Sequence, residues 1–225
     1  MVTSREPQLP AFLERPTRVD MVLMAGLMFM VVYGFVLIPL RGWLLTHPYA
    51  YTILGGGYTS AVVGGANASV GNGSVIGYVA LTMLGAIKFQ ILYYFLGRRW
   101  GREFIDMSVS HSPRLKSAAD KLVDGKHASA WTMGLIPLGY CPGPVPNTIL
   151  NALLGVQRVP FWIFLALNLC SIAVVNGVMG YLGFIYGEPV LHVIKLVDKY
   201  LLWVTLALLA VLFFQVWRRQ RNLGS

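Results

Sequence analysis

Charged side chains are scarce in this sequence of 225 residues, and acidic side chains are the scarcest. Only 12% of the residues are charged, about half the share in a typical soluble domain. No Asp or Glu occurs between Asp20 and Glu103, or between Asp124 and Glu188. This shortage excludes an ordinary soluble domain. The net charge of +9 indicates that basic residues set the orientation in the membrane, and it predicts an affinity for anionic lipids. It does not predict nucleic-acid binding, because no nucleic-acid-binding motif accompanies it.

Cysteine and clustered histidine are also lacking. Cys141 and Cys170 are too isolated for a disulfide framework or a zinc site, and the four histidines follow no ligand spacing. We therefore expect no metal and no cofactor. Ser108, Ser110 and His111 lie close together, but in a polar segment without a nucleophile elbow, so the sequence does not predict an enzyme. The residues that follow, SPRLKSAADKLVDG, predict a short amphipathic helix.

Long apolar runs are abundant. A helix needs about 20 residues to cross about 30 Å of hydrocarbon, and four runs are about that long. They are Met21–Leu40, Ser74–Gly97, Pro160–Gly187 and Tyr200–Trp217. The sequence therefore predicts an all-α polytopic membrane protein with about four full transmembrane helices. Gly183 and Gly187 form a GxxxG motif, which we interpret as tolerance of glycine more than as close helix packing.

Two further apolar stretches, residues 47–73 and 129–155, are broken by proline and glycine. Neither forms one uninterrupted helix, because proline removes a backbone donor and glycine weakens a helix interior. Backbone that leaves a helix at membrane depth has to be buried in protein or line a wet cavity. Both stretches are therefore predicted to be re-entrant helix–turn–helix segments. Their turn residues are Gly55, Gly56, Gly57, Pro142, Gly143, Pro144 and Pro146.

The distribution of basic residues predicts the orientation. Residues 1–20, the loop 98–128 and the tail 218–225 carry most of the arginine and lysine, which places all three on the cytoplasmic side. Residues 21–217 then form a single membrane domain. Six full spans are the alternative, and they would turn residues 71–73 and the basic loop to opposite faces. Each half has a broken segment and then a long span, the pattern of an inverted repeat with two facing re-entrant segments.

Lys88 is the one charged side chain deep in a predicted span. Nine residues separate it from Gly97, which is about 13 Å of helix. A lysine stem is too short to reach the interface over that distance. A charge inside the membrane costs about 3 kcal/mol or more, so we expect Lys88 to bind substrate. The alternative is a lysine bound to backbone carbonyls of a re-entrant segment, where it would stabilise the fold.

Asn147 and Asn151 follow the proline-rich turn GYCPGPVPN. Their i, i+4 spacing puts both amides on one face of a helix that starts near Pro146. The free N–H groups of its first turn, together with the helix dipole, predict an anion site. Tyr140 is a further candidate donor, with an interfacial anchor as the alternative. The two asparagines fit equally well a role in satisfying the broken backbone.

The segment PVPNTILNALLGVQRVPFWIFLALNLCSIAVVNGVMGYLG resembles the signature half of the DedA/VTT membrane proteins, in the form closest to the TVP-like, SNARE-associated branch. Upstream, YYFLGRRWGREF is similar to the family's Y-x-x-G-R-x-x-G motif. The resemblance covers residues 48–187. The matching positions are Tyr94, Gly97, Arg98, Gly101, Pro144, Pro146, Asn147, Asn151, Gly155, Phe161, Asn168, Gly180, Tyr181 and Gly183.

The resemblance implies two facing re-entrant helices and movement of a lipid between leaflets. In bacterial members the implied cargo is undecaprenyl phosphate, and in eukaryotic relatives it is phospholipid. This chain departs from the family at three places. Gln90, near Lys88, stands where an aspartate is common, Asn147 stands where an arginine would fall, and residues 47–73 hold no carboxylate. Proton coupling through carboxylates is therefore not expected.

Taken together, these patterns predict a lipid-phosphate translocase of the bacterial inner membrane. It would move undecaprenyl phosphate or a related anionic lipid through a midplane site. A phospholipid scramblase, a proton- or ion-coupled small-solute transporter, and a structural membrane protein without transport are the alternatives. An anionic lipid is the expected partner, and a homo-oligomer is left open. The predicted site residues are Lys88, Gln90, Tyr140, Asn147 and Asn151.

Overall fold

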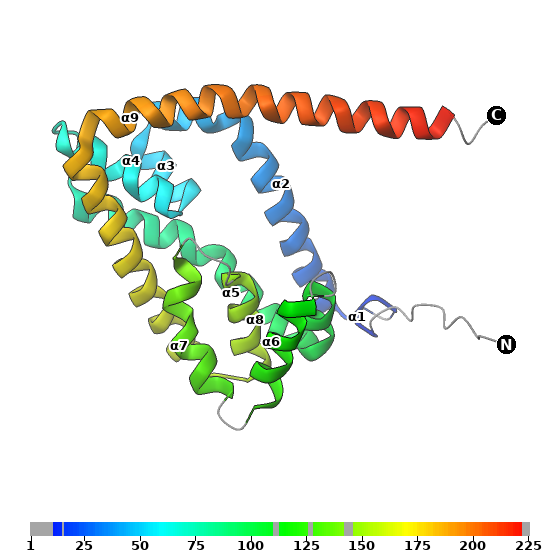
Figure 1. The fold of residues 1–225 in the computed structure, drawn as a ribbon. Helices are drawn as coiled ribbons and strands as arrows, with labels where there is room; N and C mark the ends of the chain where they lie inside the picture. Colours follow the sequence, from blue (N-terminus) through cyan, green and yellow to red (C-terminus); the bar gives the residue numbers. More distant parts are fainter. Residues whose placement is uncertain (1–10, 15, 110–112, 126–127, 142–145, 222–225) are drawn as a thin grey trace.

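The computed structural model describes residues 11–14, 16–109, 113–125, 128–141 and 146–221, and the side chains beyond Tyr200 lie outside the described part. Every regular element in these ranges is an α-helix (Figure 1). The helices are α1 (Ala11–Glu14), α2 (Arg18–Thr46), α3 (Pro48–Gly55), α4 (Tyr58–Ser69), α5 (Val75–Val109), α6 (Pro113–Asp124), α7 (Ala128–Tyr140), α8 (Asn147–Val156) and α9 (Phe161–Arg221).

Three helices are long and apolar enough to cross a membrane: α2, α5 and the Phe161–Gly187 part of α9. They indicate a membrane protein. Large apolar side chains such as Phe29 and Phe35 point outward from α2, as expected for a helix that faces lipid. The fourth predicted span, Tyr200–Trp217, lies on the C-terminal part of α9, which extends away from the other helices (Figure 1). Its side chains lie outside the described part, so four spans stay a prediction.

Both broken stretches contain the predicted pair of helices. In the first, Gly56 ends α3 in the left-handed conformation (φ 65°), and Gly57 is the N-cap of α4. Only glycine adopts this backbone without strain, so the predicted turn at Gly55–Gly57 is confirmed. In the second, α7 ends at Tyr140 and Pro146 is the N-cap of α8. The other predicted turn residues, Pro142, Gly143 and Pro144, lie outside the described residues.

The long helices α5 and α9 have matching core segments. Their starts, Val75 and Phe161, are 86 residues apart (161 minus 75). Each core segment ends at a glycine with a non-helical backbone: Gly101 (φ 61°, ψ −139°) and Gly187 (φ 48°, ψ −127°), again 86 residues apart (187 minus 101). We call Val75–Gly101 and Phe161–Gly187 the core helices. The halves α3–α4–α5 and α7–α8–α9 therefore repeat the same order.

The second helix of each hairpin packs on the core helix of the other half. A Cβ on Gly155 of α8 would lie 2.0 Å from the Tyr94 carbonyl oxygen and 2.7 Å from Arg98 N. A Cβ on Gly65 of α4 would lie 1.8 Å from the Gly180 carbonyl oxygen and 3.0 Å from Phe184 N. Gly180 and Phe184 stand 86 residues after Tyr94 and Arg98. The two crossings are thus equivalent, and both require glycine.

The GxxxG motif of α9 takes part in this packing. A Cβ on Gly183 would lie 2.2 Å from the Val62 carbonyl oxygen, and one on its counterpart Gly97 would lie 1.9 Å from the Ala152 carbonyl oxygen. Our interpretation of Gly183 as mere tolerance of glycine is therefore wrong. Backbones approach this closely only where no side chain separates them.

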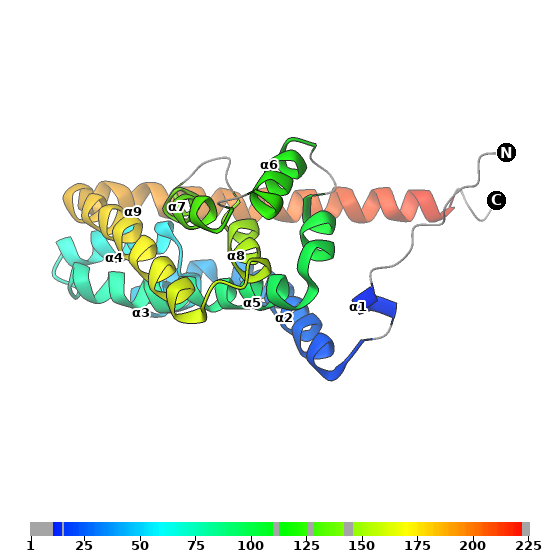
Figure 2. The ribbon, with the colours of Figure 1, turned by 90° about the horizontal axis from the view of Figure 1, so that it is seen from below.

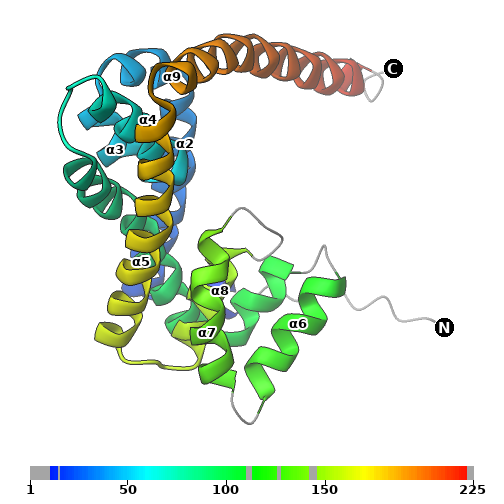
Figure 3. The ribbon, with the colours of Figure 1, turned by 60° about the vertical axis from the view of Figure 1, so that its left-hand side comes forward.

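The two core helices run antiparallel. The start of α5 meets the end of the other core helix, where a Cβ on Gly180 would lie 3.1 Å from the Val79 side chain. The end of α5 meets the start of α9, where the rings of Tyr94 and Phe164 lie 4.4 Å apart. The hairpin α3–α4 and the hairpin α7–α8 consequently lie at opposite ends of the core helices (Figure 3).

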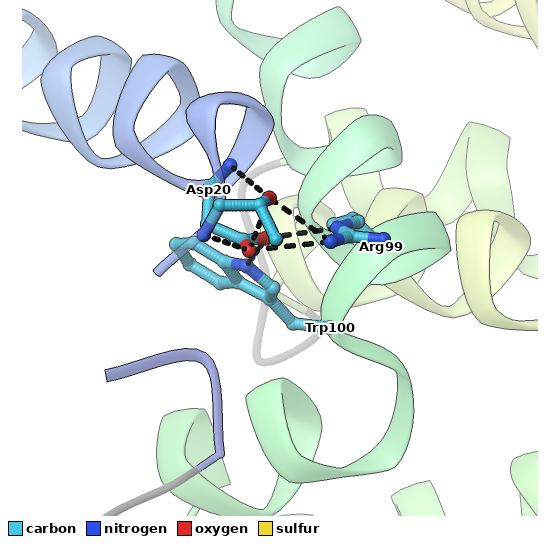
Figure 4. Close-up of polar contacts among 4 residues, drawn as sticks. Asp20, Arg99 and Trp100 are labelled. Carbon is cyan, nitrogen blue, oxygen red and sulfur yellow. Dashed lines mark hydrogen bonds and ion pairs between the residues drawn. The ribbon is translucent and has the colours of Figure 1, made fainter. Parts of the chain in front are cut away.

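The N-terminal end of α2 is tied to α5 by Asp20. Its carboxylate accepts hydrogen bonds from Arg99 Nε (2.8 Å), Trp100 Nε1 (3.0 Å) and Thr17 N (2.9 Å) (Figure 4). Thr17 and Asp20 form a capping box, so α2 begins at Arg18, three residues before the predicted span. Because Asp20 is 3% exposed, this contact fixes the end of α2 within the helix bundle.

The basic segment 98–128 is largely helical. After Gly101, α5 continues to Val109, and the predicted amphipathic helix is confirmed as α6. An ion pair between Arg102 and Asp120 joins the two helices (2.7 Å). Figure 2 shows α6 and α7 on one side of α5 and α2 on the other. The helix therefore continues past the predicted boundary at residue 98 and bends at Gly101. The cytoplasmic position of this segment stays a prediction.

Candidate functional site

Polar side chains from four helices meet in the interior between α5, α7, α8 and α9. We call this group the amide cluster, because four of its five members are amides and the fifth is a phenol. None of the five carries a formal charge at neutral pH. The members are Gln90 of α5, Tyr140 of α7, Asn147 and Asn151 of α8, and Asn168 of α9.

Asn151 is the centre of the amide cluster and is fully buried. Its Nδ2 donates to Gln90 Oε1, to Asn147 Oδ1 and to the backbone carbonyl of Asn147, each at 2.9 Å. The backbone carbonyl is only an acceptor, so it fixes which end of the Asn151 amide faces it. The predicted shared face of Asn147 and Asn151 is therefore confirmed. Because Asn151 Nδ2 also donates to the backbone carbonyl of Asn147, the alternative role, in which the amides satisfy the broken backbone, is met as well.

The carboxamide oxygen of Asn151 has no hydrogen-bond partner among the described residues, although it is buried. A buried acceptor without a donor costs about 1–3 kcal/mol, so a native protein keeps one where it serves a purpose. No donor among the described residues of the cluster reaches this oxygen. Gln157 Oε1 is the other buried side-chain acceptor without a partner in the described part of the chain. Asn151 differs from Gln157 because it lies among four further polar side chains, which makes the amide cluster the candidate site.

Tyr140 joins α7 to α9 within the cluster. Its hydroxyl donates to Asn168 Oδ1 at 2.6 Å and is within reach of the side chains of Asn147 and Asn151. Asn168 Nδ2 donates to the Phe164 carbonyl oxygen one turn earlier in α9 (2.9 Å). Tyr140 therefore lies in the predicted site and not only at an interface. Sequence reasoning missed Asn168 as a site residue. The signal that could have identified Asn168 is an amide in the middle of an apolar run.

One edge of the cluster is less buried than the rest in the part of the chain that the structure describes. Gln90, Tyr140 and Asn147 are only partly buried, whereas Asn151 and Asn168 are fully buried behind them. Asn147 is the first residue of α8, so the first peptide N–H groups of this ten-residue helix lie at the same edge. The N–H groups of Ile149 and Leu150 donate to the Pro146 carbonyl oxygen, so by helix geometry those of Asn147 and Thr148 are the ones without an intrahelical acceptor. They lie at the positive end of the helix dipole. The edge therefore offers donors, and the interior offers an unpaired acceptor.

Lys88 binds elsewhere. Its Nζ donates to the Leu54 carbonyl oxygen (2.7 Å), the Tyr33 hydroxyl (2.7 Å) and the Ile53 carbonyl oxygen (3.3 Å). Tyr33 in turn donates to the Leu54 carbonyl oxygen (2.8 Å). These carbonyls are at the end of α3, where the helix dipole is negative. The contacts match the alternative role, a lysine that holds a broken segment in place.

The helical repeat explains why Lys88 and Gln90 separate. Residues two apart on an α-helix point about 200° from each other, because each residue turns the helix by about 100°. Gln90 faces α8, so Lys88 faces the opposite side, toward α2 and α3. The expectation that Lys88 and Asn147 belong to one substrate site does not fit these contacts. The structure brings together Gln90, Tyr140, Asn147 and Asn151, and leaves Lys88 out.

Replacing Lys88 tests the two roles directly. Lys88→Met keeps the length of the side chain and removes the ammonium group, so the Leu54 carbonyl and the Tyr33 hydroxyl lose their donor. We expect a fall of about 1.5–3 kcal/mol in the free energy of unfolding, the range for a hydrogen bond to a charged group. Thermal unfolding of the purified protein measures it, with Tyr33→Phe as a milder variant. A Lys88→Met protein of normal stability that no longer transports would restore the substrate-binding role.

No family model, curated protein sequence or solved structure matches this chain. The amide cluster and the packing of the two halves are therefore the observations on which a function can be based.

Proposed function

We propose that this protein is a lipid-phosphate translocase and that the amide cluster receives the phosphate head group. In this proposal the chain has four full spans. The hairpins α3–α4 and α7–α8 are re-entrant segments of an inverted repeat, and the termini lie on the cytoplasmic side of a bacterial inner membrane. The cargo is a phosphate monoester of a long lipid, such as undecaprenyl phosphate.

The single observation that carries the proposal is the buried, unpaired carboxamide oxygen of Asn151. A phosphate monoester carries one ionisable hydroxyl with a pKa near 6, so near neutral pH part of the lipid is a monoanion with a P–OH group. That hydroxyl is the donor that Asn151 lacks. The phosphate of an ordinary phospholipid is a diester and has no P–OH group. The buried acceptor therefore favours a lipid phosphate over a phospholipid, and a translocase over a general scramblase.

The remaining phosphate oxygens need donors, and the less buried edge of the cluster supplies them. Gln90 uses its Oε1 to accept from Asn151, which leaves its Nε2 for the ligand. The first peptide N–H groups of α8 add a site for negative charge, as helix N-termini commonly do. The cluster members themselves are neutral, so binding relies on hydrogen bonds and the helix dipole. Such a site holds a monoanion without the cost of burying a full ion pair.

The positions that carry the DedA/VTT resemblance support the proposed family. Gly155 meets Tyr94 and Arg98 at the crossing of α8 and α5. Gly180 and Gly183 meet α4 at the equivalent crossing. Residues of a family motif are expected to gather at contacts that the fold requires. We therefore propose that the chain is a DedA/VTT protein of the TVP-like branch.

Reconstituted vesicles test this function. We expect vesicles that contain the protein to move a fluorescent polyprenyl phosphate between leaflets, and to leave a fluorescent phosphatidylcholine where it is. Dodecyl phosphate should compete, and its methyl ester, which lacks the P–OH group, should compete at least about tenfold less well, as expected when one charge-assisted hydrogen bond is lost. Equal movement of both lipids would identify a scramblase. Movement of neither would leave small-solute transport or a structural role.

A further inference from the structure

A second polar pair lies between the two core helices, away from the amide cluster. Asn176 Nδ2 of α9 donates to Thr82 Oγ1 of α5 at 3.1 Å. Thr82 is fully buried, and Asn176 is 4% exposed. Thr82 also donates to the Val79 carbonyl oxygen of its own helix (2.7 Å). Buried polar side chains in membrane helices are costly and usually line a path or hold helices together.

The repeat relates this pair to the amide cluster. Asn168 stands 86 residues after Thr82, and Asn176 stands 86 residues after Gln90. This is the spacing that relates the starts, the glycine crossings and the bends of the core helices. The counterpart of the Thr82–Asn176 pair is therefore Asn168 with Gln90. In the amide cluster, these two residues bond to the α7–α8 hairpin instead: Gln90 to Asn151, and Asn168 to Tyr140.

The two halves thus hold equivalent polar pairs in different states. We call each of these pairs of polar residues a station. Thr82 and Asn176 bond directly to each other, so we describe their station as closed. Gln90 and Asn168 each bond to a hairpin residue, so their station is open. If the halves exchanged conformations, the crossings at Gly65 and Gly155 and the bends at the ends of the core helices would be retained. An inverted repeat therefore has an alternative arrangement with the same backbone crossings. The hairpin positions that correspond to Asn151 and Asn147 are Ala61 and Gly57, so in that arrangement Thr82 and Asn176 would turn to the ligand without amide partners from the hairpin.

We infer that Thr82 and Asn176 form a second head-group station, closed in this structure, which opens when Gln90 and Asn168 close on each other. The inference rests on the proposed function, since the ligand of both stations is the lipid phosphate. Thr82 and Gln90 are eight residues apart, which is about 12 Å along α5. A head group that passes from one station to the other moves across the middle of the protein, and the protein never has to open both stations at once.

Mercuric ion provides a direct test, because it bridges two nearby thiols and protects both from maleimide. We would first replace Cys141 and Cys170 by serine, since both are exposed. One variant then carries Thr82→Cys with Asn176→Cys, and another carries Gln90→Cys with Asn168→Cys. We expect the first pair to be protected at once and the second pair to be protected more slowly, as the stations exchange. The four single-cysteine variants are the controls.

The transport assay completes the test. Each double variant is compared with itself before mercuric ion is added, because both variants replace residues of the proposed stations. Bridging either pair holds one station closed, so it should lower that variant's own rate of polyprenyl phosphate movement at least about tenfold. Dithiothreitol should return the rate to its value before bridging. The inference fails if the Gln90–Asn168 pair is never protected, or if transport continues while the Thr82–Asn176 pair is bridged. Protection is measured without any lipid cargo. It can therefore support the exchange of stations even if the vesicle assay refutes the lipid phosphate as cargo.

A pair of single substitutions covers the case in which a double variant does not fold. Thr82→Ser keeps the hydroxyl that accepts from Asn176, and Thr82→Val removes it while keeping the shape. We expect Thr82→Val to slow transport at least about tenfold, and Thr82→Ser to retain it. Equal transport by the two variants, at equal thermal stability, would overturn the inference.

Discussion

Gly183→Ala is expected to be among the most destabilising single-methyl changes in the protein. The new Cβ would lie 2.2 Å from the Val62 carbonyl oxygen, 2.9 Å from the Val62 carbonyl carbon and 2.9 Å from its Cα. All three atoms belong to the backbone of α4, so no side chain can rotate away. The helices would have to separate. Overpacking of a well-packed interior typically costs 1–3 kcal/mol, and we expect a loss of about 3 kcal/mol here.

The same helix supplies the matched control. Gly177 is six residues before Gly183, and a Cβ there would meet nothing within 4 Å. Gly177→Ala should therefore leave stability unchanged or raise it by up to about 1 kcal/mol, because alanine is the better helix former. Thermal unfolding of the two variants in the same detergent gives the comparison. Equal stability of Gly183→Ala and Gly177→Ala would show that α4 and α9 do not cross as described.

Asn151→Leu is expected to remove transport while the protein remains folded. The substitution deletes the unpaired carboxamide oxygen and the donor that holds Gln90 and Asn147 together. Leucine has the same number and branching of side-chain heavy atoms as asparagine, so the fully buried site stays filled. Loss of a charge-assisted hydrogen bond costs about 1.5–3 kcal/mol, which is about tenfold to a hundredfold in affinity. We expect the rate of polyprenyl phosphate movement at low lipid concentration to fall by that factor.

Stability separates this effect from unfolding. Asn151→Leu removes a buried acceptor that lacks a donor, which is favourable. It leaves Gln90 Oε1 and Asn147 Oδ1, both only partly buried, without their donor, which is unfavourable. The two effects offset, so we expect thermal stability to change by about 1 kcal/mol or less. Asn67→Leu is the control: Asn67 is a buried asparagine of α4 that donates to the carbonyl of Val63 one turn earlier (2.8 Å). It lies outside the cluster, so transport should persist. Normal transport by Asn151→Leu would refute the cluster as the site.

The sequence alone indicated that the protein lies in a membrane, and it indicated where the helices are interrupted. The absence of carboxylates over long stretches indicated a membrane protein. Gly55–Gly57 and Pro146 marked the breaks, because left-handed backbone and a missing N–H are local properties of the residue. The i, i+4 spacing of Asn147 and Asn151 likewise placed both amides on one face of α8, and Asn151 Nδ2 does donate to Asn147 Oδ1.

Only the tertiary structure decided which faces meet. The sequence shows which residues share one face of a helix, but not which helix that face contacts. The i, i+2 relation of Lys88 and Gln90 separated them, and the packing then brought Gln90 to α8 and Lys88 to the end of α3. The packing of α4 and α8, each on the core helix of the other half, was likewise decided by the tertiary structure. In the sequence, nothing distinguished Gly65 from its neighbouring glycines, and Gly155 was marked only by the family resemblance. The structure shows that a carbonyl group of a distant helix leaves no room for a methyl group at either position.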